Sequence, residues 1–313
     1  AATRRPCTVS ASITGARRTT DCSSALAYKV SACSSGALAP GAPATSKSCT
    51  VSSSDQGLNS TAPIVTGTLE GAPVAFLARH GIGHHITPTE VPYQANIYAL
   101  KSLGVERIVS ISACGSLKED FAPGHIVIPD QLYDNTRLRP RSFFGEGFVA
   151  HVSVADPFCG DLSVHVESAA REAGGVVHKG GAFITIEGPR FSTRAESNTF
   201  RSWGMSIIGM TASPEAFLAR EAEICYATMA HVTDYDVWHM SEEPVTVEMV
   251  IQTLNRNTLL AQEAIRIIAR KFKAERNCDC EHALATALIT RKDVIPAATR
   301  KKLDLLVRKY LEE

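Results

Sequence analysis

The chain of 313 residues is long enough to bury a large hydrophobic core, and 44% of its residues are hydrophobic. Lysine plus arginine equal aspartate plus glutamate at 32 each, so no net charge draws the chain to nucleic acid or to an anionic membrane, and no run of about 18 apolar residues would span a bilayer. Nine cysteines are too few for a disulfide scaffold and suit the reducing cytoplasm.

Residues 1–62 differ in composition from the rest of the chain. They are rich in serine, threonine, alanine and glycine, and their only acids are Asp21 and Asp55. Basic, acid-poor composition of this kind is typical of a transit peptide, which gives an organelle as the alternative location. We favour a disordered tail or non-native residues, because no apolar stripe could offset the entropy of ordering this stretch. One domain is therefore expected over residues 63–313.

From residue 64 onward, short β-type runs alternate with stretches of helical spacing. We predict strands at residues 64–69, 74–77, 107–111, 126–128, 183–186, 206–210 and 226–233. Helices are predicted at residues 92–103, from Ser213 onward, at 245–272 and at 297–311. The first two strands form a hairpin that turns at Glu70-Gly71. The alternation predicts an α/β fold layered around one central sheet.

The first candidate cluster, Arg79-His80-Gly81, follows the strand at residues 74–77. Sheets of this class bind ligands where their strands end. Arginine offers phosphate a rigid fork of N–H donors, and a neighbouring histidine can add another donor. A structural or surface role is the alternative for so short a motif. His84 and His85 lie nearby, but no carboxylate or thiolate has the spacing of a metal site, so we predict no metal here.

The second cluster is the run of small residues from Ser112 to Ser116, after the strand at residues 107–111. We predict a loop whose open backbone N–H groups form a nest for an anion. A plain strand-to-helix turn is the alternative. Cys114 is interpreted as a small buried residue rather than as a reactive thiolate.

The third cluster contains Asp234 and Asp236, at the end of the apolar strand at residues 226–233. Side chains alternate along a strand, so both carboxylates should point to one face, about 7 Å apart. Two carboxylates that end a buried strand are costly unless they meet a donor or a ligand. We therefore favour a ligand site over a surface turn.

Near the C-terminus, Cys278, Cys280 and His282 could bind zinc, form a strained disulfide or remain without either. A structural zinc site needs a fourth ligand, which the sequence does not place. We therefore favour free thiols and predict no metal.

These stretches together resemble the 5'-methylthioadenosine phosphorylase branch of the purine nucleoside phosphorylases, over residues 76–272. The resemblance is carried by motifs in the order and spacing of that family, among them Arg79-His80-Gly81, Ala113-Cys114-Gly115-Ser116, Glu187-Gly188-Pro189-Arg190-Phe191-Ser192, Met210-Thr211, Pro214-Glu215 and Thr233-Asp234-Tyr235-Asp236. It implies a three-layer α/β sandwich around a mixed, partly closed central sheet. It also implies a homotrimer, in which His151 faces a neighbour's site.

The resemblance assigns roles to individual residues. Arg79, His80, Ser112 and Ala113 are similar to the family's phosphate contacts. The substrate contacts it implies are Phe191 and Ser192 at the base, Met210 and Thr211 at the ribose, Asp234 and Asp236 at the purine, and Val247, Val250 and Ile251 at the 5' substituent. The implied reaction is phosphorolysis of 5'-methylthioadenosine to adenine and 5-methylthioribose 1-phosphate. Phosphate is then a co-substrate, and no other cofactor is expected.

Asp234 is the candidate acid for N7 of the leaving purine, with a pKa raised by burial and by Asp236. Ionised Asp236 only accepts hydrogen bonds, which favours a 6-amino purine.

One feature of the family is missing from the sequence. A first strand followed by a loop of the Ile-Gly-Gly-Ser/Thr-Gly kind is not found, since Gly36, Gly41 and Gly57 stand alone. A nucleoside-binding protein with weakened catalysis is therefore one alternative function. A 6-oxopurine nucleoside phosphorylase is another.

Overall fold

The computed structural model describes residues 25–30, 47–49, 52–53, 58–239, 247–271 and 275–312. The strands of its large mixed sheet are β1 (Ala25–Val30), β2 (Lys47–Cys49), β5 (Ile64–Leu69), β6 (Ala72–Phe76), β7 (Val105–Ser116), β8 (Ile126–Ile128), β9 (Gln131–Asn135), β10 (Val177–Lys179), β11 (Ala182–Ile186), β12 (Ile207–Gly209) and β13 (Cys225–Asp234). They run in the order β10-β8-β13-β7-β1-β6-β5-β2, and β12, β11 and β9 branch from β7. A separate pair joins β3 (Ser52–Ser53) to β4 (Leu58–Asn59).

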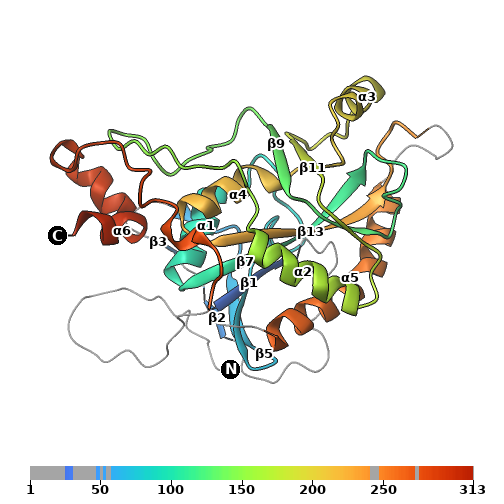
Figure 1. Ribbon diagram of the computed structural model, residues 1–313, viewed down its shortest axis with the longest axis horizontal. Coiled ribbons are helices and arrows are strands. Elements are labelled where there is room, and N and C mark those ends of the chain that lie inside the picture. Colours follow the sequence, from blue (N-terminus) through green and yellow to red (C-terminus); the bar gives the residue numbers. More distant parts are fainter. Residues whose placement is uncertain are drawn as a thin grey trace, which may run out of the picture.

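Helices cover both faces of this sheet. The helices are α1 (Tyr93–Ser102), α2 (Gly160–Glu172), α3 (Arg194–Ser202), α4 (Ala212–Glu221), α5 (Val247–Arg270) and α6 (Ala297–Leu311), with short 3-10 turns η1 (Asp279–His282) and η2 (Lys292–Val294). Helices α2 and α5 pack on one face, and α1 and α4 on the other (Figure 1). The predicted three-layer α/β fold is confirmed. Within the described residues, no helix is long and apolar enough to cross a membrane.

The central strands β7 and β13 are buried on both faces. Ile108 and Tyr226 belong to the core on the α1 and α4 side, whereas Val109 and Ala227 belong to the core on the α2 and α5 side. Strands covered on both sides lose the alternation of polar and apolar residues and become continuous apolar runs. This is why both strands were recognisable in the sequence.

Local signals placed several elements correctly. Strands β5 and β6 pair as an antiparallel hairpin, and Glu70 and Gly71 take positive φ angles of 50° and 85°, as a two-residue hairpin turn requires. Helix α1 is followed by Gly104 at φ 76°, a conformation that glycine adopts readily. Ser213 has extended φ and ψ angles, so the regular part of α4 begins at Pro214, as predicted.

Two sequence expectations differ from the structure. The run Ser112–Ser116, predicted to be a loop, continues strand β7, because its residues pair with β13 and then with β12. Residues 25–30, predicted to lack ordered structure, form β1 between β6 and β7. This short, mostly apolar run pairs with the edges of both β6 and β7, which would otherwise be unpaired. The run was missed because residues 1–62 were judged by their average composition. The boundary at residue 62 stays a prediction, since the other residues before 47 lie outside the described part.

His231 on β13 is a buried histidine in the sheet. Its side chain is almost fully enclosed, and within the described residues neither ring nitrogen has a hydrogen-bond partner. Burial lowers its pKa to about 4, because the charged ring cannot be solvated there. The folded state therefore favours the neutral ring.

We expect this histidine to make the fold sensitive to acid. The unfolded ring takes up a proton near pH 6.5, so the stabilisation is present above that pH and is lost as the pH falls towards 4, by about 3 kcal/mol at most. His231→Leu should reduce the difference in unfolding free energy between about pH 7 and about pH 4, measured with urea. His165→Leu, at an exposed histidine of α2, is the matched control. An unchanged pH dependence in His231→Leu would contradict this account.

Candidate functional site

A pocket of about 320 Å³ lies where strands of the central sheet end. Pockets of this size fit a small organic ligand. Its walls come from the segment after β6, the end of β7, the segments after β11 and β12, and the end of β13. The predicted site residues that line it are Arg79, His80, Ser112, Ala113, Phe191, Ser192, Met210, Thr211, Asp234 and Asp236. The structure thus brings together ten residues that were singled out from separate parts of the sequence.

At one end of the pocket, Arg79 is held in a buried ion pair. Its Nε and Nη2 donate to the two carboxylate oxygens of Glu215 at 3.2 and 3.1 Å, and both side chains are almost fully enclosed. Tyr226 donates its hydroxyl to the same carboxylate at 2.8 Å. A forked guanidinium fixed in this way presents its remaining edge in one orientation. In the sequence, Glu215 was named only as part of the motif Pro214-Glu215, with no role in the site.

The other edge of Arg79 faces hydroxyl groups. Nη1 donates to Oγ1 of Thr211 at 3.0 Å, and Nη2 donates to the Ser110 hydroxyl. Ser112 lies next to this group, with its Oγ 3.4 Å from that of Ser110. The family resemblance implies a ribose contact for Thr211, whereas its hydrogen bond with Arg79 places it at the cationic end of the pocket. Arginine with clustered hydroxyls is a suitable anion site.

His80 lies beside Arg79 with a defined tautomer. Its Nδ1 is 2.8 Å from the carbonyl oxygen of Ile86, which can only accept, so Nδ1 carries a proton. Burial, aided by the charge of Arg79, lowers the pKa of His80 to about 4. The neutral ring therefore leaves Nε2 as an acceptor, whereas the sequence analysis expected a second donor. Its ring stacks on His84, which also lines the pocket.

The floor of the pocket is the last part of β7. Strand β1 pairs with β7 only as far as Ile111, and β12 pairs with it from Gly115. Between these points, Ser112, Ala113 and Cys114 have no strand partner on that edge within the described residues. Ser112 and Ala113 therefore reach the pocket from the strand itself and not from the predicted loop. Burial raises the pKa of the Cys114 thiol, in line with a small buried residue.

Position 115 of β7 has no space for a side chain. A Cβ atom at Gly115 would lie 2.9 Å from Oδ1 of Asp234 and 3.1 Å from Cγ2 of Ile208. Contacts this close do not occur without displacement of a neighbour. The glycine lets β7 approach the acidic end of the pocket.

At that acidic end, Asp234 and Asp236 are both buried. Asp234 accepts from the Thr233 hydroxyl at 2.6 Å and from the backbone N–H of Asp236 at 2.8 Å. Asp236 has a φ of 52°, so it lies in a turn and does not continue the strand alternation that the sequence suggested. The pair still shares one pocket, because the turn folds back onto Asp234.

The two carboxyl groups differ in what they can still bind. Burial raises the pKa of Asp234, and it raises that of Asp236 to about 6. Oδ2 of Asp236 has no hydrogen-bond partner within the described residues, and neither has the buried hydroxyl of Ser192. Buried polar atoms without partners are costly, so they favour a ligand that supplies partners. Phe191 is partly exposed at the rim.

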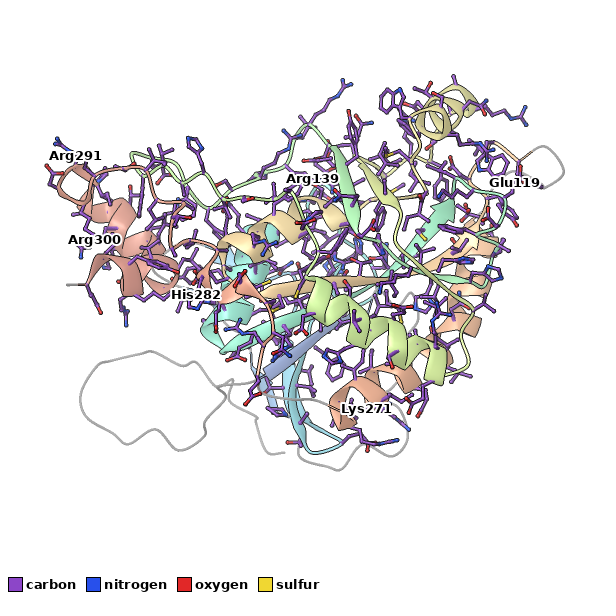
Figure 2. The ribbon with its side chains drawn as sticks, viewed as in Figure 1. Glu119, Arg139, Lys271, His282, Arg291 and Arg300 are labelled. Carbon is purple, nitrogen blue, oxygen red and sulfur yellow. The ribbon has the colours of Figure 1, made fainter. Side chains whose placement is uncertain are left out.

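Arg139 is a site-supporting residue that the sequence analysis missed. Its guanidinium is buried and donates to the backbone oxygens of Glu187, Met210 and Ser213 at 2.6, 2.7 and 2.8 Å. Figure 2 labels Arg139, which lies on the segment after β9. It thereby holds together the segments after β11 and β12 that line the pocket. No periodicity in the sequence marks such a long-range contact.

The three apolar residues assigned to the 5' substituent lie on the first turns of α5. Val247, Val250 and Ile251 are described only by their backbone. Their side chains lie outside the described part, so this assignment stays a prediction.

The fold and pocket agree with a known family. The sequence model of the phosphorylase superfamily matches residues 36–270. The chain belongs to the phosphorylase superfamily.

Individual proteins of this superfamily are similar to the chain over most of its length. The S-methyl-5'-thioadenosine phosphorylase of Geobacter sulfurreducens is 54% identical over 248 residues, which are 79% of this chain and 87% of that protein. The protein of the same name from Koribacter versatilis is 53% identical over 251 residues, 80% of this chain and 86% of that protein.

Solved structures agree with these sequences. A methylthioadenosine phosphorylase from an antarctic soil metagenomic library has a TM-score of 0.82 and 43% identity, and the match covers 91% of this chain and 98% of that one. The methylthioadenosine phosphorylase from Schistosoma mansoni in complex with adenine has a TM-score of 0.75 and 32% identity, covering 86% and 99%. The resemblance to the 5'-methylthioadenosine phosphorylase branch is confirmed.

The buried ion pair gives a test of the site's architecture. Glu215→Gln should leave the buried guanidinium of Arg79 without its counter-charge and lower the free energy of unfolding by about 3–5 kcal/mol. Urea denaturation measures this change. Asp293→Asn removes one partner of the exposed pair with Arg291 and should cost at most about 1 kcal/mol. Equal losses in the free energy of unfolding for the two substitutions would show that the buried Arg79–Glu215 pair stabilises the fold no more than an exposed ion pair does.

Proposed function

We propose that this protein cleaves 5'-methylthioadenosine with inorganic phosphate, giving adenine and 5-methylthioribose 1-phosphate. The observation that carries the proposal is the pocket itself, because a buried cationic end and a buried pair of carboxyl groups face one cavity. The relatives named above bear that activity in their names.

Phosphate would bind at the end formed by Arg79, Thr211 and Ser112. The guanidinium supplies charge, and the hydroxyls supply directed hydrogen bonds. The neutral Nε2 of His80 can accept from the P–OH of a monohydrogen phosphate. Phosphate is a co-substrate in this proposal, and positioning and charge supply the catalysis without a further cofactor.

The purine would bind at the end formed by Asp234 and Asp236. Protonated Asp234 donates to N7, and ionised Asp236 accepts from the 6-amino group through its unpartnered Oδ2. Phe191 and Ser192 line the same cavity, where the family resemblance assigns them to the base.

In the proposed reaction, the C1'–N9 bond breaks and its electron pair leaves with the purine. Asp234 transfers its proton to N7, so the base departs neutral, and a phosphate oxygen forms the new bond to C1'. The negative phosphate also stabilises the cation-like ribose before that bond forms. Burial raises the pKa of Asp236 to about 6, so the rate should fall below about pH 6, where Asp236 takes up a proton and no longer only accepts hydrogen bonds.

Assembly and location are further parts of the proposal. A homotrimer is supported by the exposed apolar side chains Val149 and Ile289, whose backbones pair next to exposed His151, since exposed apolar residues favour contact with another subunit. A cytoplasmic location is supported by the reduced state of the described cysteines, since a reducing compartment maintains cysteines that are not joined in disulfides.

Loss of the acid tests the mechanism. Asp234→Asn should lower kcat for 5'-methylthioadenosine by about 10²–10⁴-fold, because the amide cannot transfer the proton to N7. Adenine release in phosphate buffer measures the rate, and Asp293→Asn on the exposed surface serves as the control. Full activity of Asp234→Asn would remove Asp234 from its role.

Base preference tests the second carboxyl group. Asp236→Asn places an N–H donor where the wild type offers only acceptors, so it should raise the rate on 5'-methylthioinosine relative to 5'-methylthioadenosine by about 10-fold or more. Both substrates are assayed in the same phosphate buffer. A wild-type preference for the 6-oxopurine would instead support a 6-oxopurine phosphorylase.

A further inference from the structure

Four cysteines from distant parts of the chain meet on the face of the sheet covered by α2 and α5. They are Cys159 at the start of α2, Cys225 at the first position of β13, and Cys278 and Cys280 before and within η1. Their sulfur atoms all lie within 4.8 Å of one another. The sequence showed only Cys278 and Cys280 as neighbours, so the missing ligands of a metal site come from elsewhere in the fold. His282 takes no part in this group.

The spacing of the sulfurs suits one tetrahedral ion. A zinc–sulfur distance of about 2.3 Å in a tetrahedron places the sulfurs about 3.8 Å apart. Cys225 and Cys278 have their sulfurs 3.4 Å apart, and all the other pairs fall below 4.8 Å. A disulfide would require about 2.05 Å. A closed set of four thiolates is one of the recurring ligand sets of structural zinc sites.

The surroundings supply donors to the sulfurs. The backbone N–H of Leu162 donates to Sγ of Cys159 at 3.4 Å, and Nη1 of Arg220 donates to Sγ of Cys280 at 3.4 Å. Four thiolates around a divalent cation carry two net negative charges, which these donors would stabilise. Arg220 is fixed for this contact by a hydrogen bond from Nη2 to the carbonyl oxygen of Asp156.

The site would be structural and separate from the pocket. Cys225 and Asp234 stand at opposite ends of β13, which at about 3.3 Å per residue places them about 30 Å apart along the strand. Cys159, Cys225 and Cys280 are buried, so the group has little room for a reacting ligand. It joins the beginning of α2 and the sheet to the segment that leads from α5 to α6.

We propose that Cys159, Cys225, Cys278 and Cys280 bind one zinc ion that fixes the C-terminal segment to the central sheet. A structural zinc of this kind adds its binding free energy to folding, because the unfolded chain has no preformed site.

The test uses the full chain, produced with added zinc and purified under reductant without chelator. Elemental analysis by mass spectrometry should find zinc in stoichiometric amount with the chain after gel filtration. Replacement of the zinc by cobalt should give the visible bands of a tetrahedral ion and the charge-transfer absorption of thiolate ligands. A strong chelator should lower the melting temperature.

Variants separate this site from other cysteines. The double variant Cys278→Ser/Cys280→Ser should lose the metal and the chelator effect, and Cys114→Ser, at a buried cysteine outside the group, should retain both. If the double variant does not fold, Cys278→Ser alone, at the less buried ligand, should weaken the thiolate-to-cobalt absorption. Metal-free wild-type protein, zinc retained by the double variant, or an intact mass lower by the hydrogens of two disulfides would overturn the proposal.

Discussion

The parallel pairing of β7 with β13 is the constraint on which the rest of the structure depends. The register runs from Arg107 opposite Cys225 to Gly115 opposite Asp234. It places the small residues of β7 beside the acid that ends β13, and it leaves no space there for a side chain at Gly115. A shift of one residue would turn every side chain of the strand to the opposite face. Since both faces are buried, the register is strongly specified.

The pocket keeps groups of opposite charge at separate ends, where each is held by partners of its own. The charge of Arg79 is balanced behind the pocket by Glu215, whereas Asp234 is held by Thr233 and by the backbone of Asp236. Each end therefore has its own internal partners, and neither needs the other. Among the described residues that line the pocket, the buried side-chain atoms without a hydrogen-bond partner are Oδ2 of Asp236 and the Ser192 hydroxyl. In a low-dielectric interior, a polar ligand gains most binding free energy by forming hydrogen bonds with such atoms.

Local sequence signals predicted much of this arrangement. The turn at Glu70-Gly71, the end of α1 at Gly104 and the start of α4 at Pro214 depend on neighbours in the sequence, so they were readable. The ten pocket-lining residues were found through motif order and spacing. Contacts over long sequence distances were not readable: Glu215 finds Arg79 across 136 residues, and Arg139 reaches Met210 across 71. The extension of β7 was missed because glycine and serine are typical of turns. In this strand, Gly115 is instead required by the close approach of Asp234.

The two ends of β13 show how one rigid strand can serve two different demands. At its carboxyl end, polar atoms stay open to a pocket whose rim residue Phe191 is partly exposed, as substrate exchange requires. At its amino end, four sulfurs are enclosed by α2 and by the segment after α5, which suits an occupant that does not leave. Both ends place polar or polarisable groups in the interior, and a bound partner would offset the cost of burying them. Because a strand buried along its length has little freedom, each end can be filled without disturbing the other.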